Sequence, residues 1–238
     1  KSGKEAGETC GENGGDKMIS EKGLCKILKS AFKNGGYSVI QVRSRTETQP
    51  TTWRRNEIIV NGATWAVRCI TEDLPKAAAV QIVEDVGYMP MDAVTVQKNQ
   101  PNQTMLESVA GTRGSDLERV AAGGVRMRQI PVIFRERWQL YQTENGDVYA
   151  FDTELLKLID FKEAEPSAFM SQNGHLGVFE WGDSTVYIAP GRFSRANEEK
   201  ILYIAGLDWE NQIDTDDPVA NVSLFDEDRD EPLVDREE

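Results

Sequence analysis

The sequence predicts an α+β protein, with a small helix-βββ-helix lobe followed by a mainly antiparallel β-sheet lobe. Apolar residues recur at helical spacing near the N-terminus, short turns rich in Asn and Gly separate β-rich runs, and acidic residues crowd the C-terminus. The 238 residues are 39% apolar, enough for a sizeable core. The expected order is a flexible leader over 1–17, the first lobe over 18–100, a helical linker over 101–124, the sheet lobe ending in a helix over 125–207, and a disordered acidic tail over 208–238.

The first lobe is expected to open with a helix that begins after Ser20. Leu24, Leu28 and Phe32 repeat at four-residue intervals, which places them on one face of a helix. The Ser20 hydroxyl can cap the first turn, and the glycine pair at 35–36 can end the last one.

Three strands and a second helix should complete this lobe. A strand is expected over 37–43, and the β-rich runs around Asn61-Gly62 predict a hairpin with a type I′ turn, since both central positions of that turn require positive φ. Apolar residues including Val83 then recur at helical spacing over 76–86, and Gly87 can end that helix.

Beyond the first lobe, the pattern changes from helical to strand-like. Helices are expected over 105–110 and 117–122, as parts of the linker. Turn sequences at 144–147 and 181–183 lie between β-rich runs and predict two further hairpins, and helical spacing returns over 198–207.

Charge is distributed unevenly along the chain. Residues 18–70 carry 9 positive and 3 negative side chains, whereas residues 206–238 carry 2 and 13, leaving −2 of the total −13 for the rest. The acidic tail is either a solubilising segment or an arm that steers toward a basic partner protein. If it binds a partner, the expected contacts are Val222, Leu224, Phe225, Asp226, Glu227 and Asp228.

One short run within this tail resembles a known docking peptide. Asn221–Phe225 is similar to the peptide with which bacterial proteins bind the DNA polymerase sliding clamp, in which a final Leu-Phe pair fills an apolar pocket. The resemblance implies that Leu224 and Phe225 would enter such a pocket, and that the clamp is a candidate partner.

The residues offer little chemistry for catalysis. Three cysteines at spacings of 15 and 44, with a single histidine, do not have the closely spaced ligand pairs of a structural zinc site. No phosphate-binding or nucleophile motif is present, and we expect no metal or cofactor. Asp152, Glu154 and Lys157 have the residue types of a metal-dependent nuclease, but an exposed strand end explains them more simply.

Two arginine-containing runs could contact an anion. Arg135 and Arg137 are expected to point to the same side of a strand, where paired charges are the simpler interpretation. Arg192 lies in a Pro-Gly turn that needs no ligand to explain it, and His175 lies in a turn where we expect it to be solvated.

Two broader resemblances bear on function. The helix, three strands and helix over 20–87 are ordered as in double-stranded-RNA-binding domains, which implies nucleic-acid binding. The runs Gly23–Leu28, Asn61–Cys69 and Ala189–Phe193 resemble uncharacterised proteins of phages and conjugative elements of gut-type Firmicutes, which implies action inside a bacterium.

These observations favour a non-enzymatic protein-binding or inhibitor protein that acts in the cytoplasm on a basic partner, such as a host nucleic-acid enzyme, without direct nucleic-acid or membrane binding. A nucleic-acid binder or metal-dependent nuclease, and a structural subunit of an assembly, remain the alternatives.

Overall fold

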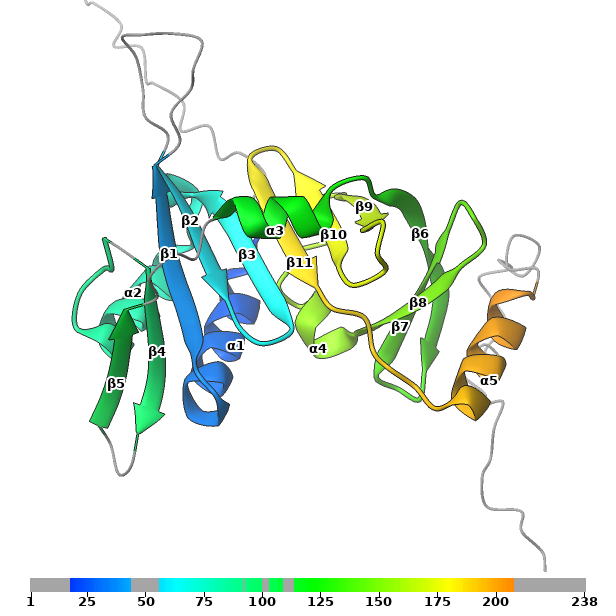
Figure 1. The fold of residues 1–238 in the computed structure, drawn as a ribbon, viewed down its shortest axis with the longest axis horizontal. Coiled ribbons are helices and arrows are strands. Elements are labelled where there is room, and N and C mark those ends of the chain that lie inside the picture. The colour runs from blue at the N-terminus through cyan, green and yellow to red at the C-terminus, as the bar shows by residue number, and fades with distance from the viewer. Residues whose placement is uncertain (1–17, 44–55, 92, 100–102, 109–113, 208–238) are drawn as a thin grey trace, which may run out of the picture. The chain divides into compact units, whose positions relative to one another are not determined.

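The computed structural model describes residues 18–43, 56–91, 93–99, 103–108 and 114–207, and these residues form an α+β fold, as predicted. One sheet of eleven strands runs through it, in the order β5-β4-β1-β2-β3-β11-β10-β9-β6-β7-β8, and every neighbouring pair is antiparallel (Figure 1). The strands are β1 Tyr37–Arg43, β2 Asn56–Asn61, β3 Trp65–Ile70, β4 Val94–Asn99, β5 Gln103–Ser108, β6 Val125–Phe134, β7 Trp138–Thr143, β8 Val148–Asp152, β9 Ser167–Met170, β10 Gly177–Trp181 and β11 Ser184–Ile188.

The helices are α1 Glu21–Asn34, α2 Lys76–Val86, α3 Gly114–Ala121, α4 Thr153–Leu156 and α5 Arg195–Ala205, with a 3₁₀ turn at Thr71–Asp73. The predicted caps of α1 are confirmed: the Gly23 N–H donates to Ser20 Oγ at 3.2 Å, and Gly35 follows the last turn. Gly87 ends α2 in the left-handed region, with φ of 90°. None of the helices described by the structure is long and apolar enough to span a bilayer.

The predicted linker is wrong in its first part. Residues expected to begin a helix at 105 instead lie in β5, which pairs with β4 from Val94 opposite Ser108 to Asn99 opposite Gln103. Met, Leu and Glu favour helices by themselves, but pairing with a neighbouring strand overrides that preference. The second part of the linker does form a helix, α3.

Three hairpin predictions are confirmed, although one turn type is wrong. Between β2 and β3, the Gly62 N–H donates to Trp65 O at 2.9 Å, so Ala63 and Thr64 make the turn. None of these residues has positive φ, which excludes type I′. Gly146 and Gly182 do adopt positive φ, 88° and 57°, in the other two predicted turns.

The sheet buries different side chains on its two faces. On β3, Trp65 and Val67 join the main core, while Ala66 between them packs with Val178 and Tyr187 on the opposite face. Figure 1 shows α3 on this second face, across β3 and β11, with α1 on the other. Because successive side chains of a strand point to opposite faces, the sheet contributes to a large core on one face and to a smaller core on the other.

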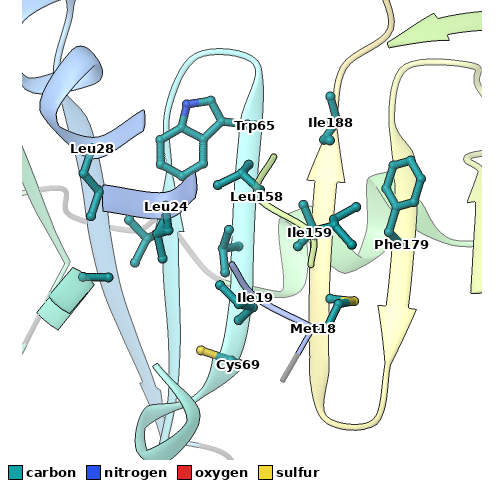
Figure 2. Packing of buried hydrophobic residues seen from close by; sticks show 14 of the residues in the cluster. Met18, Ile19, Leu24, Leu28, Trp65, Cys69, Leu158, Ile159, Phe179 and Ile188 are labelled. Atoms are coloured by element: carbon teal, nitrogen blue, oxygen red, sulfur yellow. The ribbon is translucent and has the colours of Figure 1, made fainter. Parts of the chain in front are cut away.

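The two predicted lobes share this sheet and core. Strand β3 pairs with β11 from Trp65 opposite Ile188 to Arg68 opposite Thr185. Near this junction the Ser20 N–H donates to Leu158 O at 2.9 Å, and the Asp160 N–H donates to Met18 O at 2.7 Å. Figure 2 shows apolar residues from both predicted lobes in one cluster, including Met18, Ile19, Leu158, Ile159 and Phe179. The described residues up to Ala205 accordingly form one compact unit.

Candidate functional site

The nuclease-like residues of the sequence lie together at the short helix α4, where Asp152 pairs with Arg137 and Glu154 pairs with two lysines. Asp152 caps the helix, accepting the Glu154 N–H at 2.9 Å. Its other carboxylate oxygen accepts from Arg137, at 2.6 Å from one guanidinium nitrogen and 3.1 Å from another. The Asp152 side chain is only 12% exposed, so this two-bonded pair accounts for a largely buried carboxylate.

Glu154 lies between two lysines. Lys26 Nζ, from α1, donates to one carboxylate oxygen at 2.6 Å, and Lys157 Nζ donates to the other at 2.5 Å. These hydrogen bonds lower the pKa of Glu154 from 4.5 to about 2, since they favour the ionised form. Among the described residues, no group of three or more Cys, His, Asp or Glu side chains has an arrangement that could hold a metal ion.

Helix α1 presents a stripe of lysines, which is part of the excess positive charge of residues 18–70. Lys22, Lys26, Lys29 and Lys33 are spaced by four, three and four residues, so they share one face of the helix, and all are exposed. We call these four residues the lysine stripe. Among the described residues only Lys26 of the four forms an ion pair, the exposed contact with Glu154.

The remaining charges of α1 do not neutralise the stripe. Glu21 is the only acidic residue of the helix, and its carboxylate accepts the Ala77 N–H at the start of α2, at 2.8 Å. Lys157 also pairs with Glu154, so this one carboxylate is shared by Lys157 and Lys26 of the stripe. The lysine spacing was visible in the sequence and could have identified this face.

A second surface is apolar and lies on α2 and the segment after it. Val80 is 56% exposed, Val83 40%, Tyr88 51% and Met91 62%. We call these four residues the α2 apolar surface. Val83 follows the helical spacing of the apolar residues in the sequence, but the buried side of α2 consists of Ala78, Gln81, Ile82, Asp85 and Val86.

The orientation of α2 is fixed by a buried polar contact. Tyr37 on β1 donates its hydroxyl to Asp85 Oδ2 at 2.8 Å, and Gln81 Nε2 donates to Asp85 Oδ1 at 2.9 Å. Tyr37 and Asp85 are 2% and 9% exposed. Burial and the hydrogen bond to Asp85 raise the pKa of Tyr37 far above its usual value of 10. These bonds turn Val80 and Val83 toward solvent.

The predicted pair of arginines on a strand is wrong. Arg135 and Glu136 form the turn between β6 and β7, with positive φ of 50° and 55°. The Arg137 guanidinium lies 5.1 Å from the centre of the Trp138 ring. Residues 134–138 contain no glycine or asparagine to indicate a turn, so the sequence pattern did not separate β6 from β7.

The other predicted anion-binding run lies next to this turn. The ring of Phe193 packs edge-on against Trp138, with centroids 5.1 Å apart, while Arg192 and His175 are exposed. The His175 N–H donates to Ser171 Oγ at 3.2 Å and to Asn173 Oδ1 at 3.1 Å, which accounts for its turn. The partner-binding residues predicted in the tail, Val222, Leu224, Phe225, Asp226, Glu227 and Asp228, lie outside the described residues.

Comparison with known proteins gives weak structural likenesses only. No protein-family model matches the sequence, and no curated protein matches it. A DNA polymerase III beta subunit from Eubacterium rectale aligns with 76% of this chain at 13% identity and a TM-score of 0.34. The beta subunit from the DNA polymerase of Streptococcus pyogenes aligns with 75% at 10% identity and a TM-score of 0.33. This chain spans 66% of the length of each, and likenesses of this size assign neither family nor function.

Proposed function

We propose that this chain is a non-enzymatic protein-binding protein of phage or mobile-element type. The observation that carries the proposal is the α2 apolar surface, where four large apolar side chains are exposed within twelve residues. Single exposed apolar residues are ordinary, but a gathering of them is typical of protein interfaces. Covering such side chains releases about 25 cal/mol per Å² of apolar area, so a partner gains affinity there.

The position of α2 beside the edge of the sheet supports a macromolecular partner. Helix α2 contacts β5, which is the terminal strand of the sheet, and no described strand pairs with its outer edge. Such an edge leaves backbone N–H and C=O groups available to an added strand. An extended segment of a partner can therefore pair with β5 while its apolar side chains reach the α2 apolar surface.

We propose that the acidic tail selects the partner by charge. Thirteen acidic residues over 206–238 steer toward a basic surface, and Val222, Leu224 and Phe225 supply apolar contacts. A bacterial nucleic-acid enzyme has such a surface, and inhibition of one is the proposed consequence. The resemblance of Asn221–Phe225 to clamp-docking peptides makes the sliding clamp the first partner to test.

Capture from bacterial lysate separates the contribution of the α2 apolar surface from that of the acidic tail. The baits are the full chain, a chain lacking 208–238, Val80→Glu, and Leu202→Glu as a matched control, since Leu202 is 57% exposed on α5. We expect Val80→Glu to lose the partner at every salt concentration, and Leu202→Glu to keep it. Tail deletion should weaken capture mainly at low salt, because charge steering is screened above about 0.15 M.

Binding of the purified sliding clamp tests whether the clamp is the partner of the acidic tail. The full chain should bind, and the double variant Leu224→Ala and Phe225→Ala should bind at least tenfold more weakly, since buried aromatic anchors carry most of the energy of such contacts. Equal capture by the full chain and by Val80→Glu would contradict the role of the α2 apolar surface. Clamp binding unchanged in the tail variant would contradict the docking peptide.

The lysine stripe favours a second candidate function, nucleic-acid binding. Its first and last lysines are eleven residues apart, so at 1.5 Å per residue the stripe extends over about 16 Å. Four ammonium groups on one face suit a row of phosphates, which contribute sequence-independent affinity. The exposed Lys26–Glu154 pair costs little to open, because such surface pairs contribute less than about 1 kcal/mol.

Salt dependence tests this candidate. Each phosphate contact adds about 0.9 to the slope of log affinity against log salt for duplex DNA. The double variant Lys22→Gln and Lys29→Gln should therefore lower the slope by about 1.8 in fluorescence anisotropy with a 20-base-pair duplex. The control variant, Lys98→Gln with Lys162→Gln, removes two exposed lysines elsewhere and should leave the slope unchanged. Equal slopes for all three proteins would exclude the stripe as a nucleic-acid site.

A further inference from the structure

The turn between β6 and β7 contains backbone strain at two successive residues. Arg135 and Glu136 have φ of 50° and 55°, a region that residues other than glycine, asparagine and aspartate rarely adopt. The neighbouring turn between β7 and β8 uses Gly146 for its positive φ and avoids this cost. Strain of this kind persists where the surrounding structure holds it, and such residues gather at functional surfaces.

The strained turn arranges arginines and aromatic rings in a row. The Arg135 guanidinium lies 5.5 Å from the centre of the Phe134 ring, and the Arg137 guanidinium lies 5.1 Å from that of Trp138. Phe193, which follows β11, joins the two rings edge-on, with its centroid 6.0 Å from that of Phe134 and 5.1 Å from that of Trp138. An arginine therefore lies at each end of a row of three rings. We call these five residues the aromatic platform.

The aromatic platform is held in place and is still accessible. Arg135 Nη2 donates to Asn197 Oδ1 at 3.2 Å, and the Arg137 side chain is 63% exposed although it forms an ion pair. Trp138 and Phe193 are half-buried. Side chains that are already fixed by neighbours lose little conformational freedom when a ligand binds, so the platform is preorganised.

A line of contacts connects the aromatic platform to the lysine stripe. Asp152, which pairs with Arg137, caps α4 two residues before Glu154. Glu154 in turn pairs with Lys157 and with Lys26 of the stripe. Figure 1 shows α4 between α1 and strands β7 and β8, and α4 contacts β8. The stripe and the platform thus belong to one connected surface.

This connected surface is positive overall. It has eight basic side chains, which are the four of the stripe, Lys157, Arg135, Arg137 and the exposed Arg192 beside Phe193, against three acidic ones, Glu136, Asp152 and Glu154. The adjoining helix α5 carries two basic and two acidic residues and does not change the balance. An anionic ligand is therefore favoured along the whole length of the surface.

Phosphates together with unpaired bases fit this combination of groups. Proteins that bind single strands use a positive path along the sugar-phosphate backbone and aromatic side chains on which bases stack, with a contribution from arginine. A duplex hides the ring faces of its bases, so it can contact the lysine stripe but not the platform. An acidic protein segment would match the charges but would leave the rings without a stacking partner.

We propose that single-stranded nucleic acid binds along this surface, with its phosphates on the lysine stripe and Lys157 and with bases stacked on Trp138 and Phe193 beside Arg137. This inference rests on the second candidate function, nucleic-acid binding by the lysine stripe, and names the class of nucleic acid.

Fluorescence anisotropy with an oligothymidylate of about 16 nucleotides, and with an abasic strand of equal length, separates base contacts from phosphate contacts. The unmodified chain should bind the oligothymidylate at least about fivefold more tightly than the abasic strand, as expected for one stacked base. Trp138→Leu should remove this preference and leave the affinity for the abasic strand unchanged. Trp181→Leu is the matched control, since Trp181 is 37% exposed on the β10–β11 hairpin, and should keep the preference.

The platform and the stripe can fail separately. Equal affinity of the unmodified chain for the two strands, which needs no variant to fold, would overturn the platform and leave the stripe. An unchanged preference in a folded Trp138→Leu protein would overturn it as well, and so would a poly-glutamate peptide of equal charge that competes as strongly as the oligothymidylate. Weaker binding of both strands by Lys22→Gln with Lys29→Gln, with the preference retained, would support both contacts. If neither strand nor a duplex binds, the second candidate function fails too.

Discussion

The hydrogen bond between Tyr37 and Asp85 should control how firmly α2, and with it the α2 apolar surface, is held on the sheet. Tyr37→Phe removes the hydroxyl and leaves the ring in the core. The bond is 2.8 Å long and both residues are buried, and hydrogen bonds to charged groups contribute about 1.5–3 kcal/mol. Gln81 still donates to Asp85, so the carboxylate keeps one partner. We expect the free energy of unfolding to fall by about 2 kcal/mol.

Urea unfolding followed by circular dichroism measures this loss. For a unit of this size, a change of 2 kcal/mol corresponds to a decrease of about 4–8 °C in the melting temperature. Tyr203→Phe is the control, since Tyr203 is 69% exposed, and it should change stability by less than about 0.5 kcal/mol. If Tyr37→Phe is as stable as the unmodified chain, α2 is not held by this bond and the reasoning is refuted.

The same pair predicts a pH dependence. The pKa of Tyr37 is raised in the folded protein, so the unfolded chain loses this proton from about pH 10 while the folded chain keeps it. The stability contributed by this group is therefore complete below pH 10 and is lost as the pH rises above it. The difference between Tyr37→Phe and the unmodified chain should consequently shrink between pH 10 and 11.

Three further predictions follow from individual contacts. Cys69 is 1% exposed and burial raises its pKa to about 12, so it should react with a thiol reagent at pH 8 only on unfolding, more slowly than half-buried Cys25; equal rates would contradict its placement. Gly177→Ala would place a Cβ 2.5 Å from the Phe151 ring, and we expect it to lower the free energy of unfolding by about 1–3 kcal/mol in chemical denaturation. Gly87→Ser is the comparison, because no atom lies near its Cβ and the variant tests the cost of positive φ alone. The Glu154 carboxyl should titrate near pH 2 in NMR experiments, so its ion pairs are lost only as the pH falls toward that value. The double variant Lys26→Met with Lys157→Met should move the titration midpoint toward 4.5. A midpoint near 4.5 in the unmodified chain would show that the lysines do not stabilise the ionised carboxylate.

Local patterns predicted the elements whose signals are contained within a few residues. The Ser20 cap and the glycines after α1 and α2 act on their own helix ends, so they could be predicted without knowledge of the fold. The β5 strand and the Arg135-Glu136 turn were not, because pairing with β4 and the β6–β7 register impose them from neighbouring strands. The joining of β3 to β11 brings together segments more than a hundred residues apart, which no local pattern encodes.

The candidate surfaces show the same division. The lysine stripe follows from helical spacing alone and was predictable once the helix was placed. The α2 apolar surface was not, because both sides of α2 carry apolar residues, and the packing against α1 and the hydrogen bond from Tyr37 decide which side is buried.

Photo-crosslinking from α2 tests the protein-binding proposal most directly. A photoreactive amino acid replaces Val83 in one protein and Leu202 in another, both of which are exposed positions on helices. After irradiation in bacterial cells, position 83 should give a discrete crosslinked protein whose yield falls when Val80→Glu is added, and position 202 should not give that product. The same product from both positions, or none from position 83, would contradict the assignment of the α2 apolar surface as the partner contact.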